Sequence, residues 1–338
     1  MKALNLFTLA LSVGSLPAFA AVGVSSPVSG AKLASPFLLT ASASPCSSQP
    51  ISSMGYSLDN SPNTVVVYST SINTQVTATA GAHTLHVKSW GNQGASCAVD
   101  VPLTIANASA GPSIPSNAIA ASGIHVSPNW KADFDTGTGS GSATGAMSLV
   151  NQPSLSGTAR QFVTTTTNYG GERYSDLFGT DSAATNFLYD GWLYLASPTT
   201  GIANIEMDLN QVMANGQTVI FGFQCDGWSG TWDYTANTGT PTKPVDTWLH
   251  SNQTCNPHSW TPNAWHHVQI SYSRDSAGNA TYKTVWLDGN RQDLNVTVPA
   301  AFALGWGPAL LTNFQVDGSS STSSASTIYM DNLTIYRW

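Results

Sequence analysis

The stretch Asn263–Asn295, "NAWHHVQISYSRDSAGNATYKTVWLDGNRQDLN", contains two runs in which apolar and polar residues alternate as in β-strands. The runs "HHVQISYSRD" and "TYKTVWLDG" are separated by a short polar segment with a glycine, which favours a turn. Similar runs recur from Ile124 to Trp338, among them "ARQFVTTTT", "GWLYLASP", "TVIFGFQC" and "LLTNFQVDG", and no long stretch has helical periodicity. Roughly 215 residues of this kind predict one jelly roll.

The same stretch resembles the hairpin of concanavalin A-like and laminin G-like lectin/glucanase domains, in which a "WHHV" strand leads through a tight turn to a "V-x-L-D-G" strand. The closing "IYMDNLTIYRW" is similar to the last strand of these domains. The resemblance covers residues 124–338 and implies two curved antiparallel sheets with a ligand on the concave face. It implies no single activity, because this fold hosts lectins, hydrolases and lyases.

The segment from Val22 to Ile105 also consists of short alternating runs, such as "VVVYSTS" and "TLHVKSW", and about 85 residues of this pattern indicate a small β-sandwich. The stretches "YSLDN" (Tyr56–Asn60) and "AGAHTLHVKSWGNQGA" (Ala80–Ala95) resemble bacterial immunoglobulin-like modules, which usually serve as spacers. We therefore expect an all-β chain with an immunoglobulin-like β-sandwich over 21–106, a Ser-, Ala- and Pro-rich linker over 107–123 and a jelly roll over 124–338.

The first twenty residues, "MKALNLFTLALSVGSLPAFA", contain one basic residue, Lys2, then an apolar core and a final A-x-A sequence. This order is typical of a signal peptide, so we expect cleavage near Ala20 and secretion. No later apolar run is long enough to span a bilayer.

The composition excludes several classes of protein. Lys and Arg number only 11 in 338 residues, whereas a nucleic-acid-binding protein would carry a basic stripe. The hydrophobic content of 41% is enough to fill a core, which argues against disorder. We expect a monomer that neither binds nucleic acid nor inserts into a membrane.

The four cysteines allow three pairings. We predict Cys46–Cys97 and Cys225–Cys255, because this pairing keeps each disulfide within one proposed domain. The chain has no CxxC motif and no Cys/His spacing typical of zinc, so structural disulfides are expected.

The segment "ANIEMDLNQV", Ala203–Val212, alternates apolar and polar residues like a half-buried strand. Its polar face predicts the floor of a sugar-binding groove, with a glutamine of the segment "FGFQCD" beside it. The residues expected on this floor are Asn204, Glu206, Asp208, Asn210 and Gln224.

Two carboxylates on one strand also suggest hydrolysis. Family 16 glycoside hydrolases of this superfamily carry E-x-D-x-E or E-x-D-x-x-E, and the resemblance matches Glu206 to the nucleophile and Asp208 to the assisting aspartate. The acid/base position then falls on Asn210 or Gln211, and an amide cannot donate and regain a proton near neutral pH. Binding is therefore favoured over hydrolysis, with Glu206, Asp208 and Glu172 as the catalytic candidates of the alternative.

From Trp228 to Trp265 the chain carries five tryptophans and Tyr234, with glycine, proline and polar residues between them. Flat aromatic faces suit sugar rings, and Tyr and Trp add a polar group. We expect Trp228, Trp232 and Tyr234 to form a groove wall on an excursion that the Cys225–Cys255 disulfide closes. Trp265 begins a strand and is expected in the core.

A polysaccharide lyase needs a base and groups that stabilise a uronate, rather than a pair of carboxylates. The candidates for these roles are Arg173, Gln224, His266, His267 and Tyr272, which form no lyase motif.

Binding requires no cofactor, but one structural metal is suggested. Asp331 in "YMDN" resembles the last-strand aspartate with which jelly-roll domains hold Ca²⁺, an ion that takes six to eight oxygen ligands.

The sequence thus predicts a secreted, lectin-like protein that binds a polysaccharide on the concave face of a jelly roll. The alternatives are a glycoside hydrolase or polysaccharide lyase on the same fold, and an adhesion or structural module without a sugar ligand. Glycan binding without turnover supports the first, and release of sugar products supports the second. The absence of both binding and release supports the third.

Overall fold

The computed structural model describes residues 22–33, 35–45, 47–105, 111–135 and 141–338. The predicted signal peptide and Cys46, with its predicted disulfide to Cys97, lie outside these residues. Within them the regular structure is β-strand, together with two 3₁₀ turns, η1 (Ile124–Val126) and η2 (Pro257–Ser259). No helix in the part of the chain that the structure describes has the length and apolar character needed to cross a bilayer.

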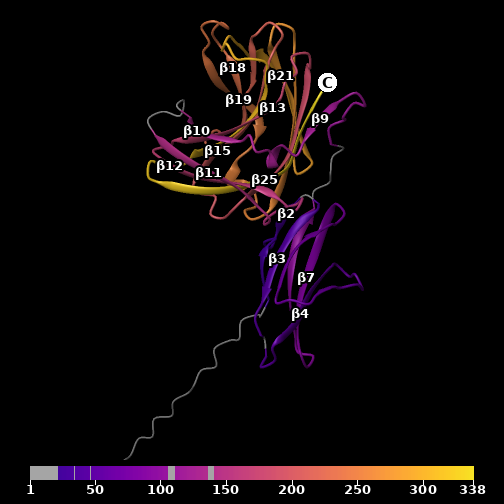
Figure 1. The fold of residues 1–338 in the computed structure, drawn as a ribbon. Helices are drawn as coiled ribbons and strands as arrows, with labels where there is room; N and C mark the ends of the chain where they lie inside the picture. The colour runs from indigo at the N-terminus through magenta and orange to yellow at the C-terminus, as the bar shows by residue number, and fades with distance from the viewer. Residues whose placement is uncertain (1–21, 34, 46, 106–110, 136–140) are drawn as a thin grey trace, which may run out of the picture.

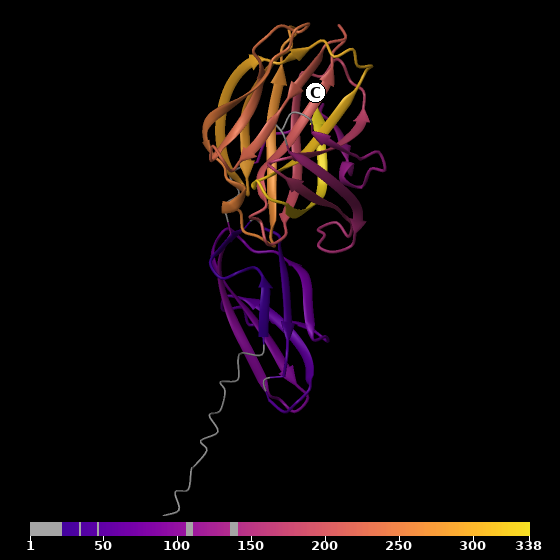
Figure 2. The same cartoon turned by 90° about the vertical axis from the view of Figure 1, so that its left-hand side faces the viewer.

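Residues 22–105 form two sheets at one end of the molecule (Figures 1 and 2). Leu39 and Ile72 of one sheet and Leu85 and Val87 of the other share one buried apolar cluster, so the sheets enclose a core of their own. This is the small β-sandwich that the alternation predicts, and its immunoglobulin-like identity stays a prediction. The first sheet has the order β1 (Val22–Ser26), β3 (Phe37–Ala43), β6 (Ser71–Val76), and the second β2 (Ala31–Leu33), β8 (Ser96–Ile105), β7 (Gly81–Gly91), β4 (Ile51–Leu58), β5 (Val65–Val67).

The remaining strands form two larger sheets, of nine and eight strands. The nine-stranded sheet has the order β10 (Lys131–Asp135), β13 (Gly171–Gly179), β24 (Leu310–Gly318), β15 (Ile202–Val212), β17 (Phe223–Asp226), β18 (Thr231–Asn237), β19 (Asp246–Thr254), with β16 (Thr218–Phe221) beside β15 and β23 (Ala301–Phe302) beside β16. The eight-stranded sheet has the order β11 (Ser142–Val150), β12 (Ala159–Thr167), β25 (Ser324–Arg337), β14 (Asn186–Leu195), β20 (Trp265–Arg274), β21 (Asn279–Leu287), β22 (Asn290–Pro299), with β9 (Ile119–Ser122) along β25.

The two larger sheets pack face to face around one apolar core, as a jelly roll requires. Phe162 of β12 and Phe314 of β24, which lie in different sheets, have ring centroids 4.7 Å apart. Strands β20 and β21 pair antiparallel with Ile270 opposite Val285, so the stretch Asn263–Asn295 contains the predicted strand pair.

Two features lie at the junction that the sequence assigns to a linker. Residues 119–122 form β9, which extends the eight-stranded sheet along the end of β25, so this part of the linker prediction is wrong. A strand of four residues, "IAAS", is too short to show an alternation that separates it from a linker. The two sandwiches also touch, because Leu38 packs against Ala159 and the buried Trp265.

Candidate functional site

Strand β15 lies in the interior of the nine-stranded sheet and has two different faces. Ile205, Met207 and Leu209 are fully buried in the core between the sheets. The opposite face forms the floor of a groove of about 660 Å³. The side chains of β15 on this floor are Asn204, Glu206, Asp208 and Asn210, the set that the alternation predicts.

The strands on either side of β15 continue the floor. Gln315 of β24 and Gln224 of β17 lie opposite Glu206, and Asp317 and Asp226 lie opposite Asn204. Side chains of directly opposed residues point to the same face of a sheet, so the register gathers amides and carboxyls into rows.

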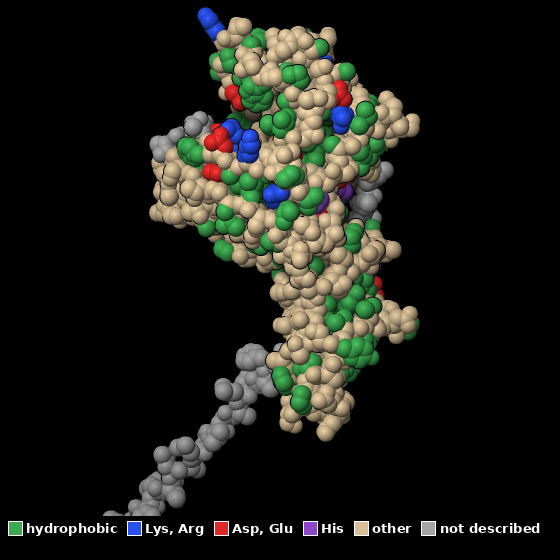
Figure 3. Space-filling model, in the orientation of Figure 1, with side chains coloured by type: hydrophobic (Ala, Val, Ile, Leu, Met, Phe, Trp, Pro, Cys, Tyr) green, Lys and Arg blue, Asp and Glu red, His purple; other side chains and the backbone are tan. Residues whose placement is uncertain are grey.

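The groove walls come from the outer strands of the same sheet and from loops. They carry further acidic groups, an arginine, a histidine and three tryptophans. The wall residues include Asp135, Arg173, Asp233, Asp246, Trp248, His250, Trp228 and Trp306. Figure 3 shows acidic and basic side chains close together on the visible face of the larger sandwich.

Of the three aromatic residues predicted for the wall, only Trp228 is there. Trp228 lines the groove with 59% of its surface exposed. Trp232 is fully buried and stacks on Phe223, with ring centroids 5.2 Å apart. The prediction is wrong for Trp232 and Tyr234, because both belong to β18 and alternate with Asp233, which faces the groove.

Several residues that line the groove are not among those predicted from the sequence. Asn313, Gln315 and Asp317 alternate with apolar residues in "TNFQVDG", as the polar residues of "ANIEMDLN" do. That pattern was sufficient to assign them to a second polar strand face. Trp306 follows β23 in irregular structure and had no comparable signal.

The amide of Gln315 connects three carboxyl groups of the groove. Its Nε2 donates to Glu206 Oε1 at 2.8 Å, to Asp317 Oδ1 at 3.1 Å and to Asp135 Oδ2 at 3.3 Å. The Glu206 and Asp317 oxygens that share this donor therefore lie within about 6 Å of each other, because hydrogen bonds are this short.

Burial and crowding change the acidity of these carboxyls. Burial, followed by the charges of Asp208 and Asp317, raises the pKa of Glu206 well above its ordinary value. Burial also raises the pKa of Asp208 to about 7, although a hydrogen bond from the Phe223 amide opposes this shift. The pKa of Asp317 is likewise raised to about 7, first by burial and then by its neighbours.

The groove therefore contains carboxyl groups whose pKa values are raised toward neutral pH by burial and crowding. The position at the end of the Glu206 motif is Asn210, an amide, and Asp317 of β24 places a further carboxyl within about 6 Å of Glu206. The amide of Gln211 bonds to the backbone of Asp181 and Ala184, away from the groove.

Glu172, the third catalytic candidate, does not face the groove. It is buried on the inner side of β13, against Gly145 of β11 in the opposite sheet. Its neighbour Arg173 points the other way and lines the groove.

The lyase candidates are divided between different parts of the molecule. Arg173 and Gln224 lie in the groove. His266 and His267 belong to the opposite sheet, where they bond to Asp288 and Asp190 at 2.7 Å each. Tyr272 is fully buried in the core. The five residues therefore do not form one site.

Asp331 is buried and accepts several hydrogen bonds from the protein. Its carboxylate accepts hydrogen bonds from the hydroxyl groups of Ser154 and Ser156 and from the backbone amides of Leu155, Ser156 and Asn332. These bonds and a contact with His125 lower its pKa, against the opposing effect of burial. The calcium role of Asp331 stays a prediction, and the hydrogen bonds already engage both of its oxygens.

Three groove residues have ligand atoms that lie within 4.8 Å of one another and could hold a cation: Asp226, Asp233 and His250. Each already has protein partners. His250 Nδ1 lies 2.8 Å from Asp233 Oδ2, and Asp226 accepts from the backbone amides of Trp228 and Ser229.

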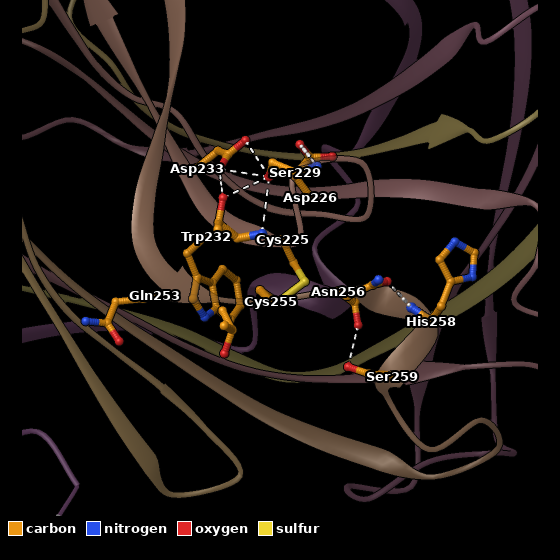
Figure 4. Close-up of a disulfide and its surroundings, with 12 residues drawn as sticks. Cys225, Asp226, Ser229, Trp232, Asp233, Gln253, Cys255, Asn256, His258 and Ser259 are labelled. Carbon is orange, nitrogen blue, oxygen red and sulfur yellow. Dashed lines mark hydrogen bonds between the residues drawn. A yellow bond between two sulfur atoms is a disulfide. The ribbon is translucent and has the colours of Figure 1, made fainter.

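The predicted Cys225–Cys255 disulfide is confirmed. It joins β17 to the segment that follows β19, below the wall of the groove. Figure 4 shows the disulfide and Trp232 on one side of these strands, and Asp226 and Asp233 with Ser229 on the other.

The fold and the groove define an all-β protein whose larger sandwich carries an acidic trough with partly exposed tryptophans. No family model and no curated protein matches the chain. Solved structures with some likeness include a carbohydrate-binding module of the β-sandwich superfamily, at 12% identity over 93% of this chain and 97% of that chain, with a TM-score of 0.31. Others are the cellulose-induced protein Cip1, at 14% over 61% and 90% with a TM-score of 0.37, and the alginate lyase vAL-1 of a Chlorella virus, at 10% over 62% and 93% with a TM-score of 0.35. Similarity at this level assigns no activity to the chain.

Proposed function

We propose that the groove on the nine-stranded sheet binds a polysaccharide. The observation that supports this function is the presence of Trp228, Trp248 and Trp306 around a floor of buried amides and carboxyls. Aromatic faces cover the apolar side of a sugar ring, while amides and carboxyls bond its hydroxyl groups. The disulfide fits an extracellular location, where such polymers occur.

Replacing both exposed tryptophans tests the proposal. We expect Trp228→Ala with Trp306→Ala to weaken glycan binding at least tenfold in affinity electrophoresis against a panel of polysaccharides, since each is 43–59% exposed and lines the groove. Tyr68→Ala is the matched control, because Tyr68 is 89% exposed on the smaller sandwich. Equal loss in the control, or binding that the double variant retains, contradicts the proposal.

Hydrolysis of the bound glycan is the second candidate, and the shared donor Gln315 favours it. Retaining glycosidases place two carboxyls about 5–5.5 Å apart, and the shared donor keeps the Glu206 and Asp317 oxygens no more than about 6 Å apart. In this reading a protonated carboxyl donates to the glycosidic oxygen while the ionised one attacks the anomeric carbon.

Product analysis separates the two candidates. Hydrolysis predicts that the protein releases reducing ends, and that Glu206→Gln or Asp317→Asn stops the release while binding persists. Asp100→Asn, an exposed change on the smaller sandwich, should leave release unchanged. If no polysaccharide yields reducing ends, hydrolysis is excluded and the binding function stands.

A further inference from the structure

The groove has a strong excess of acidic groups. Seven carboxyl groups line it, against two side chains that can be cationic. Both of these already lie beside carboxylates. Arg173 Nη2 is 2.9 Å from Asp133 and Nη1 is 3.8 Å from Asp135, and His250 bonds to Asp233. The seven carboxyls are those of Asp135, Glu206, Asp208, Asp226, Asp233, Asp246 and Asp317.

The floor also contains an acceptor without a donor. Asn210 is 2% exposed on the groove floor, and its Oδ1 has no hydrogen-bond partner among the described residues. Buried acceptors of this kind are rare in folded proteins, because each loses its bonds to water. A ligand that brings hydrogen-bond donors into the groove would satisfy the Oδ1 of Asn210.

We propose that the polysaccharide for which this groove is built is a cationic amino-sugar polymer with free, protonated amines. This inference rests on the proposed function of the groove. An ammonium group has three donors, no acceptor and a positive charge, so it satisfies both the donor deficit and the acidic excess. A nearby ammonium group lowers the raised pKa values of Glu206, Asp208 and Asp317 and so favours their ionised forms. A uronate polymer would add further negative charge to the groove, and a neutral polymer would supply no cation.

The distribution of the carboxyl groups favours a polymer over a single metal ion. They belong to six strands, from β10 at one edge of the sheet to β19 at the other. One ion has room for six to eight oxygen ligands at 2.3–2.6 Å and reaches only neighbouring groups. An oligosaccharide with an amine on each sugar presents several cations along one chain.

Matched oligomers test the inference on the full chain. Calorimetric titration compares a glucosamine oligomer with the N-acetylglucosamine oligomer of equal length, in which each ammonium group is replaced by an uncharged acetamide. We expect the amine form to bind at least tenfold more tightly at low salt, and this advantage to shrink as salt screens the charges. Equal or tighter binding of the acetylated form overturns the inference while the proposed function stands. If neither these oligomers nor any polysaccharide of the panel binds, both fail.

Two further measurements test whether the groove carboxyls or a bound metal ion cause the tighter binding of the amine oligomer. Asp246→Asn removes a charge from the groove wall and should weaken the amine oligomer roughly tenfold while leaving the acetylated oligomer unchanged. Asp100→Asn is the control outside the groove. Titration with Ca²⁺ or Mg²⁺ alone should show no binding. Binding of either ion that also blocks both oligomers equally would identify a metal site and overturn the inference.

Discussion

Trp228 and Trp232 are four residues apart and have opposite environments. Trp228 lies on the turn after β17 with 59% of its surface in solvent, and its ring lies edge-on to that of Tyr169. Trp232 is fully buried, stacks on Phe223 and donates its indole N–H to Gln292. One side chain is free to contact a ligand, and the other stabilises the strand that carries the groove wall.

Alanine substitutions at these two positions should have different effects. We expect Trp232→Ala to lower the free energy of unfolding by about 3–5 kcal/mol, because it empties a packed site in the core. Trp228→Ala should change it by no more than about 0.5 kcal/mol and reduce glycan binding instead. Denaturant titration and a binding assay on both variants measure this difference. Similar destabilisation by the two substitutions would contradict the assignment.

The local sequence contained part of this information. The alternation in "TWDYTAN" separates Asp233 from Trp232 and Tyr234, so a strand there already requires the aromatic and acidic side chains to face opposite ways. The glycines and polar residues on either side of it, in "CDGWSG" and "TGTPTKP", nevertheless indicated a loop excursion, in which no such alternation applies. The side of a strand that faces the core is decided by distant partners, here Phe223 and Tyr282.

At the level of strands, the groove is a product of register. Glu206 and Gln315 are 109 residues apart in the chain and come together because β15 pairs with β24. The polar face of β15 followed from its own alternation, whereas its neighbours depended on non-local pairing that one sequence does not reveal. The raised pKa values of the carboxyls, and the position of Asp317 near Glu206, depend on the same pairing.

The disulfide stabilises the strands of the groove wall. Cys225 and Cys255 close a loop with a sequence separation of 30, which contains β18 and β19. Replacing both cysteines by serine should lower the free energy of unfolding by about 2–4 kcal/mol, because the unfolded chain gains conformational freedom. Denaturant titration measures the loss, and the wild type under reducing conditions provides the comparison. Unchanged stability in the double variant would show that packing alone holds these strands.

For the whole molecule, the buried acidic groups predict a pH dependence of stability. The raised pKa values of Glu206, Asp208 and Asp317 mean that the folded state binds more protons than the unfolded state between about pH 4 and 7. Stability should therefore fall as the pH rises through this window, by up to about 1.4 kcal/mol per pH unit for each group. The pKa of His266, raised by Asp288 against the effect of burial, acts in the same direction above about pH 6.5.

Denaturant titrations at about pH 5 and pH 7.5 measure this slope. The lowered pKa of Asp331 does not interfere, because its stabilisation is lost only below about pH 4. The combined variant Glu206→Gln, Asp208→Asn, Asp317→Asn should flatten the slope. Stability that rises between the two pH values in the wild type would contradict the buried acidic groove.

The general architecture followed from composition and alternation, since many short strands without helical periodicity leave few alternatives to stacked antiparallel sheets. Details that depend on a few residues did not follow. Strand β9 escaped detection within an Ala- and Ser-rich segment, and the environment of Asp331 depends on the distant Ser154 and Ser156.

A crystal structure of the full chain with a glycan oligomer at saturating concentration tests the central claim most directly. We expect sugar rings in the groove, against Trp228 and Trp306 and within hydrogen-bonding distance of Glu206 and Asn210. Sugar density on any other surface, with the groove filled only by water, would contradict it.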